Sequence, residues 1–307
     1  MIAAADFGVV ADWCGDDDTA TLNTAAVQAA CEEAGRLFNP PAFVDGGGAA
    51  GEIVLLPRGG VLCGWISLPS YVRICGAAQY GTVLKMPDDF PADQNWITDN
   101  DLASFGGGLE RLNLYSRNYN AISGASIFRC RSMQDTPIVR ECRIYAGNRI
   151  GIDAGPGIGG ATSITFDHVM INGTSNIGGI MNPLMVVDYG NPTTVNLRTL
   201  QFAGLAPYIP GSRGLVIKGG SIHAHDLHPE NLQFGIEIAN ANGNTFINAS
   251  QGHPEVFAPI LISDPTPVGS VELRDIRRNA STGYTVNDGR PGRASRSESI
   301  GITPVIF

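Results

Sequence analysis

The chain is poor in charge, in aromatic residues and in long apolar runs. Of its 307 residues, 16% are charged, 7% are aromatic and 43% are hydrophobic, a composition typical of a globular protein with a sizeable core. Basic side chains are outnumbered, and the net charge of −9 argues against nucleic acid or an anionic membrane as a partner. This charge also disfavours an acidic polymer as substrate, unless a local basic patch or a cation intervenes.

Several other features are missing. No apolar run reaches the length of a transmembrane helix. The opening residues, MIAAADFGVV, lack the basic and apolar regions of a signal peptide, which predicts a chain made and folded in a cytosol. The six cysteines include no C-x-x-C pair and no zinc-like histidine partner, so we expect reduced, buried thiols. No metal or other cofactor is indicated.

From residue 51 onward the sequence contains a loose repeat of short runs with period-2 alternation, which indicates strands. We chose one inward-facing anchor from each of seven runs: Leu114, Ile144, Ile171, Phe202, Ile222, Ile247 and Leu273. These anchors recur at intervals of roughly 20 to 31 residues, which is the range of solenoid repeats. Repeats of this length, without paired helices, predict an all-β solenoid, a parallel β-helix. Its turns are expected in NRIGIDAG, NGTSNIGG and NANGN.

One amphipathic helix is expected over residues 19–34, ahead of the repeats. The residues sharing its apolar face are Leu22, Ala26, Val27, Ala30 and Ala34. Asp18 or Thr19 would be the N-cap and Gly35 the C′ residue. Such a helix would cover the open first coil of the solenoid. A calcium site at Asp16–Asp18 is the alternative, although consecutive carboxylates lack the alternating spacing of an EF-hand loop.

The same region resembles a known family. FGVVADWCGDDDTATLNTAAVQAACEEAG is similar to the N-terminal signature of the pectate-lyase superfamily, roughly F-G-A-x-G-D-G-x-x-D-D-T-x-A-x-Q-x-A. The matching residues are Phe7, Gly8, Asp17, Asp18, Thr19, Ala26 and Gln28. GEIVLLPRGGVLCGWISLPSYVRICGAAQYGTVLKM resembles the segment that follows in the family. The match covers residues 5 to about 86, and beyond them the coil pattern alone supports it.

The resemblance implies a single right-handed parallel β-helix with an N-terminal capping helix. The superfamily includes polysaccharide lyases, glycoside hydrolases, epimerases and bacteriophage tailspikes, so it specifies fold better than activity. Residues 11–15 replace the family's Asp-Gly step. The catalytic motifs of the polygalacturonase-like enzymes do not occur in their required order in this chain. HDLHPE at 225–230 does not match the Asp-Pro-His-Asp/Glu motif of the alginate epimerases.

Two sets of residues are candidates for a site. Glycoside hydrolysis needs two facing carboxylates, and the candidates on the middle coils are Asp167, Asp188, Asp226, Glu230 and Glu237. Candidates for substrate binding are His223, His225, Arg213 and Lys218. The two histidines would share one strand face. Lyase chemistry needs a basic residue, and Arg213 and Lys218, which flank GLVI, are the nearest fit. The alternative is a solvated strand edge with ordinary surface charges.

The tail bears on assembly. RPGRASRSES reads as an extended linker, and ESIGITPVIF ends on an apolar strand that would cross to a neighbouring subunit or pack along its own helix. We expect three regions, 1–50, 51–279 and 280–307. The resemblance implies a homotrimer and a virion protein (tailspike, fibre or decorating subunit) that binds host surface polysaccharide, with a lyase or hydrolase as the alternative.

Overall fold

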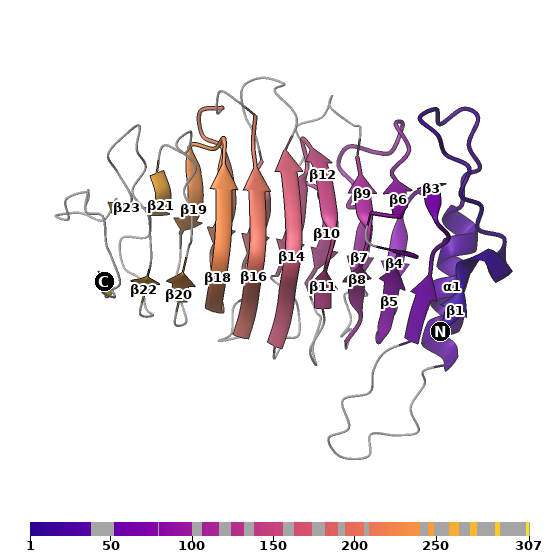
Figure 1. Cartoon of the computed structure of the whole chain (residues 1–307), viewed down its shortest axis with the longest axis horizontal. Coiled ribbons are helices and arrows are strands. Elements are labelled where there is room, and N and C mark those ends of the chain that lie inside the picture. The colour runs from indigo at the N-terminus through magenta and orange to yellow at the C-terminus, as the bar shows by residue number, and fades with distance from the viewer. Residues whose placement is uncertain are drawn as a thin grey trace, which may run out of the picture.

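The computed structural model describes residues 1–37, 52–78, 80–99, 106–116, 124–131, 138–155, 163–173, 182–189, 194–205, 209–239, 245–248, 258–263, 271–274, 286–288 and 305–306. In these residues the chain forms a right-handed parallel β-helix whose coils stack along one long axis (Figure 1). The fold expected from the sequence is therefore confirmed. Among the described residues, no helix has the length and apolarity needed to cross a membrane.

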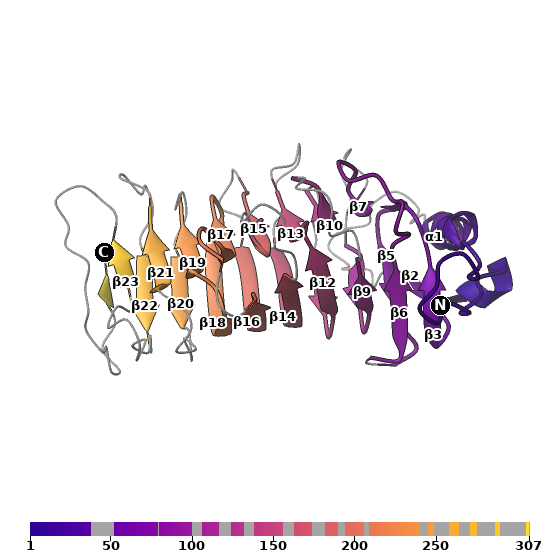
Figure 2. The same ribbon diagram turned by 90° about the horizontal axis from the view of Figure 1, so that it is seen from above.

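Two sheets build the solenoid, and the turned view separates them (Figure 2). The path of sheet A runs through β1 (Ile2–Ala3), β2 (Glu52–Leu55), β5 (Val72–Cys75), β8 (Gly108–Glu110), β11 (Ile138–Arg140), β14 (Ser163–Gly173), β16 (Thr194–Ala203), β18 (Ser221–Glu230), β20 (Thr245–Asn248), β22 (Val271–Arg274) and β24 (Val305–Ile306). Its remaining strands are β3 (Gly59–Leu62), β6 (Thr82–Lys85), β9 (Asn113–Tyr115) and β12 (Arg143–Gly147). Sheet B comprises β4 (Ile66–Leu68), β7 (Ile97–Asp99), β10 (Ser126–Cys130), β13 (Ile150–Ala154), β15 (Met185–Val187), β17 (Arg213–Ile217), β19 (Phe234–Ile238), β21 (Ala258–Ile262) and β23 (Val286–Asp288).

Sheet A bends at one residue per coil. The residues at the bend form a corner row: Arg111, Glu141, His168, Thr199 and Asp226, with φ of 55°, 52°, 52°, 51° and 56°. Positive φ is unfavourable for residues other than glycine, and Thr199 is β-branched. The strands of neighbouring coils are paired on both sides of the bend, so each coil has to bend at the same position, even where this requires an unfavourable conformation. We call the strands before the corner row the first half of sheet A, and β3, β6, β9, β12 and the ends of β14, β16 and β18 the second half.

The core is formed by stacked inward side chains, and the register corrects part of our anchor series. Leu114, Ile144, Ile171 and Phe202 lie opposite one another on successive strands, as predicted. Phe202, however, pairs with Pro229 near the end of β18. The anchor Ile222 lies in a different row, opposite Val195. The choice of Ile222 as the residue equivalent to Phe202 was wrong. β18 continues through the bend, and Ile222 lies on the part of β18 before the bend, whereas Phe202 lies on the part of β16 after it.

The N-terminal helix differs in its bounds. α1 (Thr24–Leu37) follows a 3-10 turn, η1 (Ala4–Phe7), and packs on β2, β4 and β5 at one end of the solenoid (Figure 1). It begins later than predicted, at Thr24, so Asp18 and Thr19 are not its N-cap, and Gly35 lies inside it. Leu22 precedes the helix and is exposed.

The predicted helix face and its role are otherwise confirmed. Val27, Ala30 and Ala34 are fully buried. The Gln28 amide accepts from the Ser67 N–H at 3.0 Å and donates to the Ser67 carbonyl at 3.2 Å. This exchange occupies backbone groups at the exposed end of sheet B, which is what a capping helix is needed for.

One predicted turn is a strand. NRIGIDAG contains β13 (Ile150–Ala154), which pairs with β10 and β15. Its glycine and aspartate favour a turn, but Gly151 allows a close approach to the Ile171 side chain and the Leu184 carbonyl. NANGN and most of NGTSNIGG lie outside the described residues. Near the C-terminus, β23 extends sheet B and β24 pairs antiparallel with β22 of the same chain.

The cysteines are all free, and five of the six are buried. Burial raises the pKa of Cys31, Cys63 and Cys142 to about 12, which suppresses the reactive thiolate. Cys14 is the exception because it lies exposed in the segment before α1.

We therefore expect a thiol reagent such as DTNB to modify one cysteine of the native protein rapidly and all six after denaturation. Cys14→Ser should abolish the fast phase, whereas Cys63→Ser should leave it intact. A fast phase that persists in Cys14→Ser would contradict the burial described above.

Candidate functional site

The second half of sheet A presents two outward rows of side chains. In one row, Val83, Asn113, Arg143, Met170, Gln201 and His228 lie opposite one another on successive strands. The other row contains Lys85, Tyr115, Tyr145, Asn172, Ala203 and Glu230. Because parallel strands lie about 4.8 Å apart, side chains from different coils act as one surface. The rows change from aromatic to polar along the axis.

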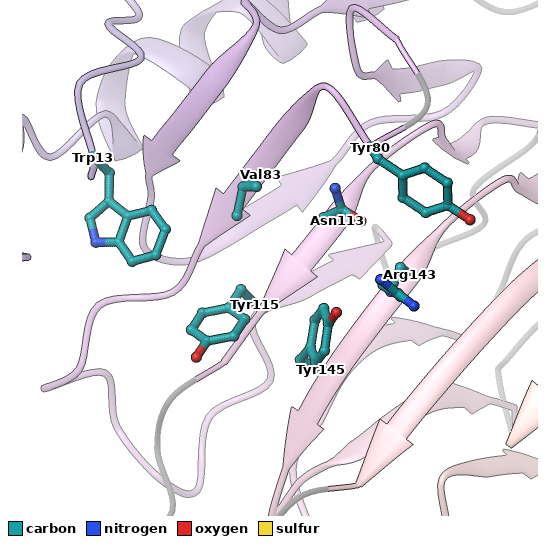
Figure 3. Close-up of a pocket in the computed structure, with 7 residues that line it drawn as sticks. All are labelled: Trp13, Tyr80, Val83, Asn113, Tyr115, Arg143 and Tyr145. Atoms are coloured by element: carbon teal, nitrogen blue, oxygen red, sulfur yellow. The ribbon is translucent and has the colours of Figure 1, made fainter. Parts of the chain in front are cut away.

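The aromatic end forms a pocket of about 310 Å³, which we call the aromatic pocket (Figure 3). Its lining residues are Trp13, Tyr80, Val83, Asn113, Tyr115, Arg143 and Tyr145. The Trp13 and Tyr115 ring centroids are 6.0 Å apart, and those of Tyr115 and Tyr145 are 5.4 Å apart. These separations lie within the range of favourable aromatic contacts. Three rings from separate parts of the chain thus form a continuous apolar surface.

Two polar groups adjoin this surface. The Arg143 guanidinium lies 5.6 Å from the centroids of both Tyr80 and Tyr145, which places it between the two rings (Figure 3). Asn113 is 8% exposed, and its Oδ1 is buried without a hydrogen-bond partner among the described residues. A few polar groups on an apolar wall are typical of small-ligand sites, where they orient the bound molecule.

Trp13 is held in the pocket by a buried charge. The Lys85 side chain is fully buried, and its Nζ lies 3.1 Å from Asp17 Oδ2 and 2.7 Å from Asp88 Oδ1. Trp13 Nε1 donates to Asp17 Oδ1 at 2.9 Å, and the Asp88 N–H donates to Asp17 Oδ2 at 2.8 Å. Asp17 therefore ties the N-terminal segment to β6, and it is neither a helix cap nor a carboxylate free for calcium.

The charge of Asp17 is stabilised in the folded state. Burial alone would raise the pKa of Asp17, but the hydrogen bonds from Asp88 and Lys85 outweigh it and hold this pKa below its usual value. Gly60 adds a steric requirement, because a Cβ there would collide with the Trp13 carbonyl oxygen. The Trp13 backbone can then approach closely enough to donate to the Gly60 carbonyl at 3.0 Å.

A second pocket, of about 280 Å³, continues along the solenoid, and we call it the polar pocket. It is lined by Tyr80, His168, Val169, Met170, Thr199, Leu200, Gln201, Asp226 and His228. Tyr80 lines both pockets, so the two adjoin. In the outward rows beside it, Glu230 accepts from Gln201 Nε2 at 3.0 Å and lies 3.7 Å from His228 Nε2.

The sequence-predicted site residues are divided among three places. Asp226 lines the polar pocket and Glu230 stands beside it. His223 and His225 are exposed on the first half of sheet A, while Ile222 and Ala224, which alternate with them along β18, are buried as predicted. Asp167, also on the first half, contacts His168 Nδ1 at 2.8 Å.

The remaining predicted residues lie on sheet B. Arg213 forms an ion pair with Glu237, which also accepts from Ser263 Oγ at 2.7 Å. The two opposite charges neutralise each other between adjacent coils, so a structural role accounts for the presence of both residues without a ligand. Asp188 follows β15, and the exposed Lys218 follows β17. The structure thus does not bring the five predicted carboxylates together at one site.

Asp153 is one of the carboxylates on sheet B that we did not select from the sequence. Asp153 on β13 is 9% exposed and lies opposite Arg129 of β10, while Arg131 Nη2 lies 3.2 Å from Asp153 Oδ2. Burial raises the pKa of Asp153, and Asp188 adds to this effect, although Arg131 and Arg129 oppose it. The Asp188 N–H donates to the Ala154 carbonyl at 2.7 Å, so the two aspartates lie on adjacent coils.

The aromatic pocket was also missed, although part of it was readable. Tyr115 and Tyr145 each follow an anchor, Leu114 and Ile144, so period-2 alternation places both rings outward on adjacent coils. Trp13 and Tyr80 carry no such signal. The position of Trp13 depends on the N-terminal segment that packs beside β3, and the position of Tyr80 depends on a turn before β6 in which its φ is 59°.

No family model matches the chain, and no curated protein matches it in sequence. Three solved structures are similar in fold. A glycosyl hydrolase-like protein from Parabacteroides merdae has 14% identity and a TM-score of 0.42, covering 78% of this chain and 95% of its own. ORF18 of Geobacillus virus E2 has 13% identity and a TM-score of 0.45, and the match covers 89% of this chain and 60% of ORF18. The A-module of the mannuronan C-5 epimerase AlgE4 from Azotobacter vinelandii has 15% identity and a TM-score of 0.47, and the match covers 94% of this chain and 81% of the A-module. Similarity at this level does not indicate which activity this chain has.

Replacing Asp17 with asparagine would leave Asp88 as the carboxylate partner of the buried Lys85. We expect a loss of about 1.5–3 kcal/mol in the free energy of unfolding at pH 7, the range for hydrogen bonds to charged groups. Because the folded-state pKa of Asp17 is lowered, the difference from wild type should shrink as the pH falls from about 4 through that pKa.

Urea unfolding followed by tryptophan fluorescence measures this loss. Asp18→Asn is the matched control, since the Asp18 side chain is exposed and its replacement should change stability by less than about 0.5 kcal/mol. Equal losses in the two variants would contradict the role given to Asp17.

Proposed function

We propose that this protein binds polysaccharide along the second half of sheet A, with the aromatic pocket as the main contact. The observation that carries the proposal is the row of Trp13, Tyr115 and Tyr145, whose rings line one pocket on three successive parts of the surface. The apolar faces of sugar rings pack on aromatic side chains, because burying these surfaces releases water.

The extent of the surface favours a polymer over a single sugar. The aromatic pocket and the polar pocket share Tyr80, and together they span the strands from β6 to β18. At about 4.8 Å per strand, the five steps from β6 to β18 amount to roughly 24 Å. A linear chain of several sugar units matches this length. The hydroxyl groups beyond the aromatic rings would meet Gln201, His228 and Thr199, which are suitable hydrogen-bonding partners.

The biological setting that we propose is a bacteriophage virion protein that recognises a polysaccharide of the host surface. Its support is the resemblance of residues 5 to about 86 to a superfamily that includes tailspikes. Assembly as a homotrimer and attachment to other virion proteins stay predictions from the sequence. The residues that would carry such contacts near the C-terminus lie mostly outside the described part of the chain.

Depolymerisation of a polysaccharide held on sheet B is the second candidate function, and Asp153 is the observation that favours it. General acid catalysis of glycoside hydrolysis uses a carboxyl group whose pKa is raised, beside a second carboxylate. Asp153 is buried with a raised pKa, and Asp188 lies on the next coil. In this reaction Asp153 would protonate the leaving oxygen, and water would add to the anomeric carbon.

Binding can be tested by affinity electrophoresis in gels that contain neutral polysaccharides such as dextran and glucomannan, or acidic ones such as alginate and hyaluronan. We expect Tyr115→Ala and Tyr145→Ala to weaken binding about tenfold or more each, since each removes an aromatic contact worth about 1.4 kcal/mol or more. Trp65→Ala is the control, because Trp65 is an exposed aromatic residue that does not line the pocket.

Equal retardation of wild type and both tyrosine variants by every retained polysaccharide would contradict the proposed binding surface. Tyr145→Phe should bind as wild type does, because the ring face is preserved. A loss of binding in Trp65→Ala would place the contact elsewhere on the protein.

Cleavage of whichever polysaccharide binds can be followed by the release of reducing ends. If Asp153 is the general acid, Asp153→Asn should lower the rate by at least about 100-fold, and the wild-type rate should fall as the pH rises through the raised Asp153 pKa. Glu237→Gln is the control, since this carboxylate already pairs with Arg213. Cleavage that survives in Asp153→Asn would exclude this role.

A further inference from the structure

The aromatic pocket contains a single ionised side chain, and it is a cation. Of the residues that line this pocket, Arg143 alone carries a formal charge, although the whole protein has a net charge of −9. The composition of the chain disfavours an acidic ligand, but the local arrangement supplies the basic group that would reverse this expectation. The electrostatics of the ligand site are thus opposite in sign to those of the protein.

Arg143 is oriented but its charge is not neutralised. It stacks between Tyr80 and Tyr145 at 5.6 Å from each centroid, and its Nε donates to the weak acceptor Met170 Sδ at 3.2 Å. Among the described residues no carboxylate lies within ion-pair distance of it. By contrast Arg73, Arg131 and Arg213 each pair with an acidic side chain.

The stacking also determines which edge of the guanidinium is available. Arginine has five N–H donors in one plane, and stacking on aromatic faces leaves the in-plane edge for hydrogen bonding. Nη1 and Nη2 form the fork that matches the two oxygens of a carboxylate or sulfate. The unpartnered group of Asn113 in the same outward row is its Oδ1, an acceptor, which suits a sugar hydroxyl and not the anionic group itself.

None of the acidic side chains near Arg143 lies within ion-pair distance of it in the described part of the chain. Asp17 and Asp88 share the buried Lys85 at the Trp13 end of the pocket. Glu141 lies in the corner row, and it contributes to the raised pKa values of Arg111 and Arg140 only after Cys75 and Glu110, respectively. Asp226 in the polar pocket lies three strands away from β12, or about 14 Å, which exceeds the distance over which exposed charges interact at physiological salt.

We propose that the aromatic pocket selects a sugar unit that carries an anionic group, a carboxylate or a sulfate, and that this group binds Arg143. The inference rests on the proposed polysaccharide binding and assigns the class of its ligand. The sugar ring packs on Tyr115 and Tyr145, and the anionic group points toward the guanidinium. The Trp13 end would accept a neutral unit of the same chain, because Asp17 and Asp88 are close to it.

The test compares each anionic polysaccharide with a neutral form of the same backbone. Alginate, hyaluronan and polygalacturonate are titrated beside their carboxyl-reduced forms, and chondroitin sulfate beside its desulfated form, with tryptophan fluorescence and gel retardation as readouts. We expect at least one parent polymer to bind about tenfold or more tightly than its reduced or desulfated counterpart. The carboxyl-reduced and desulfated forms also distinguish a carboxylate ligand from a sulfate ligand.

Arg143→Met identifies the group responsible, since methionine keeps an apolar stem for the stacking with the tyrosines. The variant should bind the anionic and the neutral forms with equal affinity, whereas the wild type prefers the anionic form. Arg198→Met is the matched control, because Arg198 is an exposed arginine on the first half of sheet A. Circular dichroism and thermal unfolding check that the variants are folded, and Arg143→Lys, which keeps the charge without the fork, replaces Arg143→Met if that variant is unstable.

Three results would overturn the inference in different ways. Equal binding of charged and neutral forms, with binding still lost in Tyr145→Ala, would exclude the selection of an anion and leave the proposed function intact. A preference that survives in Arg143→Met would place the anion at another residue. If no polymer binds, charged or neutral, the proposed function fails and this inference fails with it.

Discussion

The parallel register between successive coils is the constraint on which the rest of this structure depends. Each strand can satisfy its backbone groups only by pairing with the strands before and after it. Coils of unequal length must therefore stay aligned wherever they pair, and their irregular residues lie outside the paired stretches. The corner row shows how strict this is: five successive coils bend at a residue of positive φ, and a threonine takes this conformation in one of them.

The candidate site is a direct product of this register. Tyr115 and Tyr145 are a whole coil apart in sequence but directly opposite in space, so their rings meet without any loop having to position them. Arg143 and Asn113 are paired in the same way at the start of the same two strands. A surface of this kind is rigid, because its side chains project from paired strands, and preorganised surfaces lose less entropy on binding.

The N-terminal segment completes what the coils cannot provide. The first coil has an open end, and α1 covers it through packing and through the Gln28–Ser67 exchange. The same segment carries Trp13 across β3 to the aromatic row, where Asp17 holds it by joining the buried Lys85. Leaving such a lysine without its partners would cost several kcal/mol. This gives a physical reason for one of the aspartates that precede the helix. Asp17 is the counterion of the buried Lys85, and the position of the Trp13 ring in the aromatic pocket depends on it.

The sequence allowed the fold to be predicted but revealed only part of the site. Alternating runs and their spacing specify stacked strands, and Leu114, Ile144, Ile171 and Phe202 have the register expected of them. The pattern fails at β18, where one strand passes through the bend, and at β13, where glycine and aspartate resemble a turn. The two tyrosines could be inferred from their anchors. The Asp17–Lys85 pair could not, because its members are far apart in the chain and no local pattern relates them.

Binding of polysaccharide on the second half of sheet A, across the aromatic row, is what we propose for this protein. A crystal structure of the protein with an oligosaccharide cut from the polymer that it retains most strongly would test this proposal. We expect sugar rings packed on Tyr115 and Tyr145, with the sugar chain directed along the solenoid toward Gln201 and His228. An oligosaccharide bound on sheet B near Asp153, with the aromatic pocket empty, would contradict it.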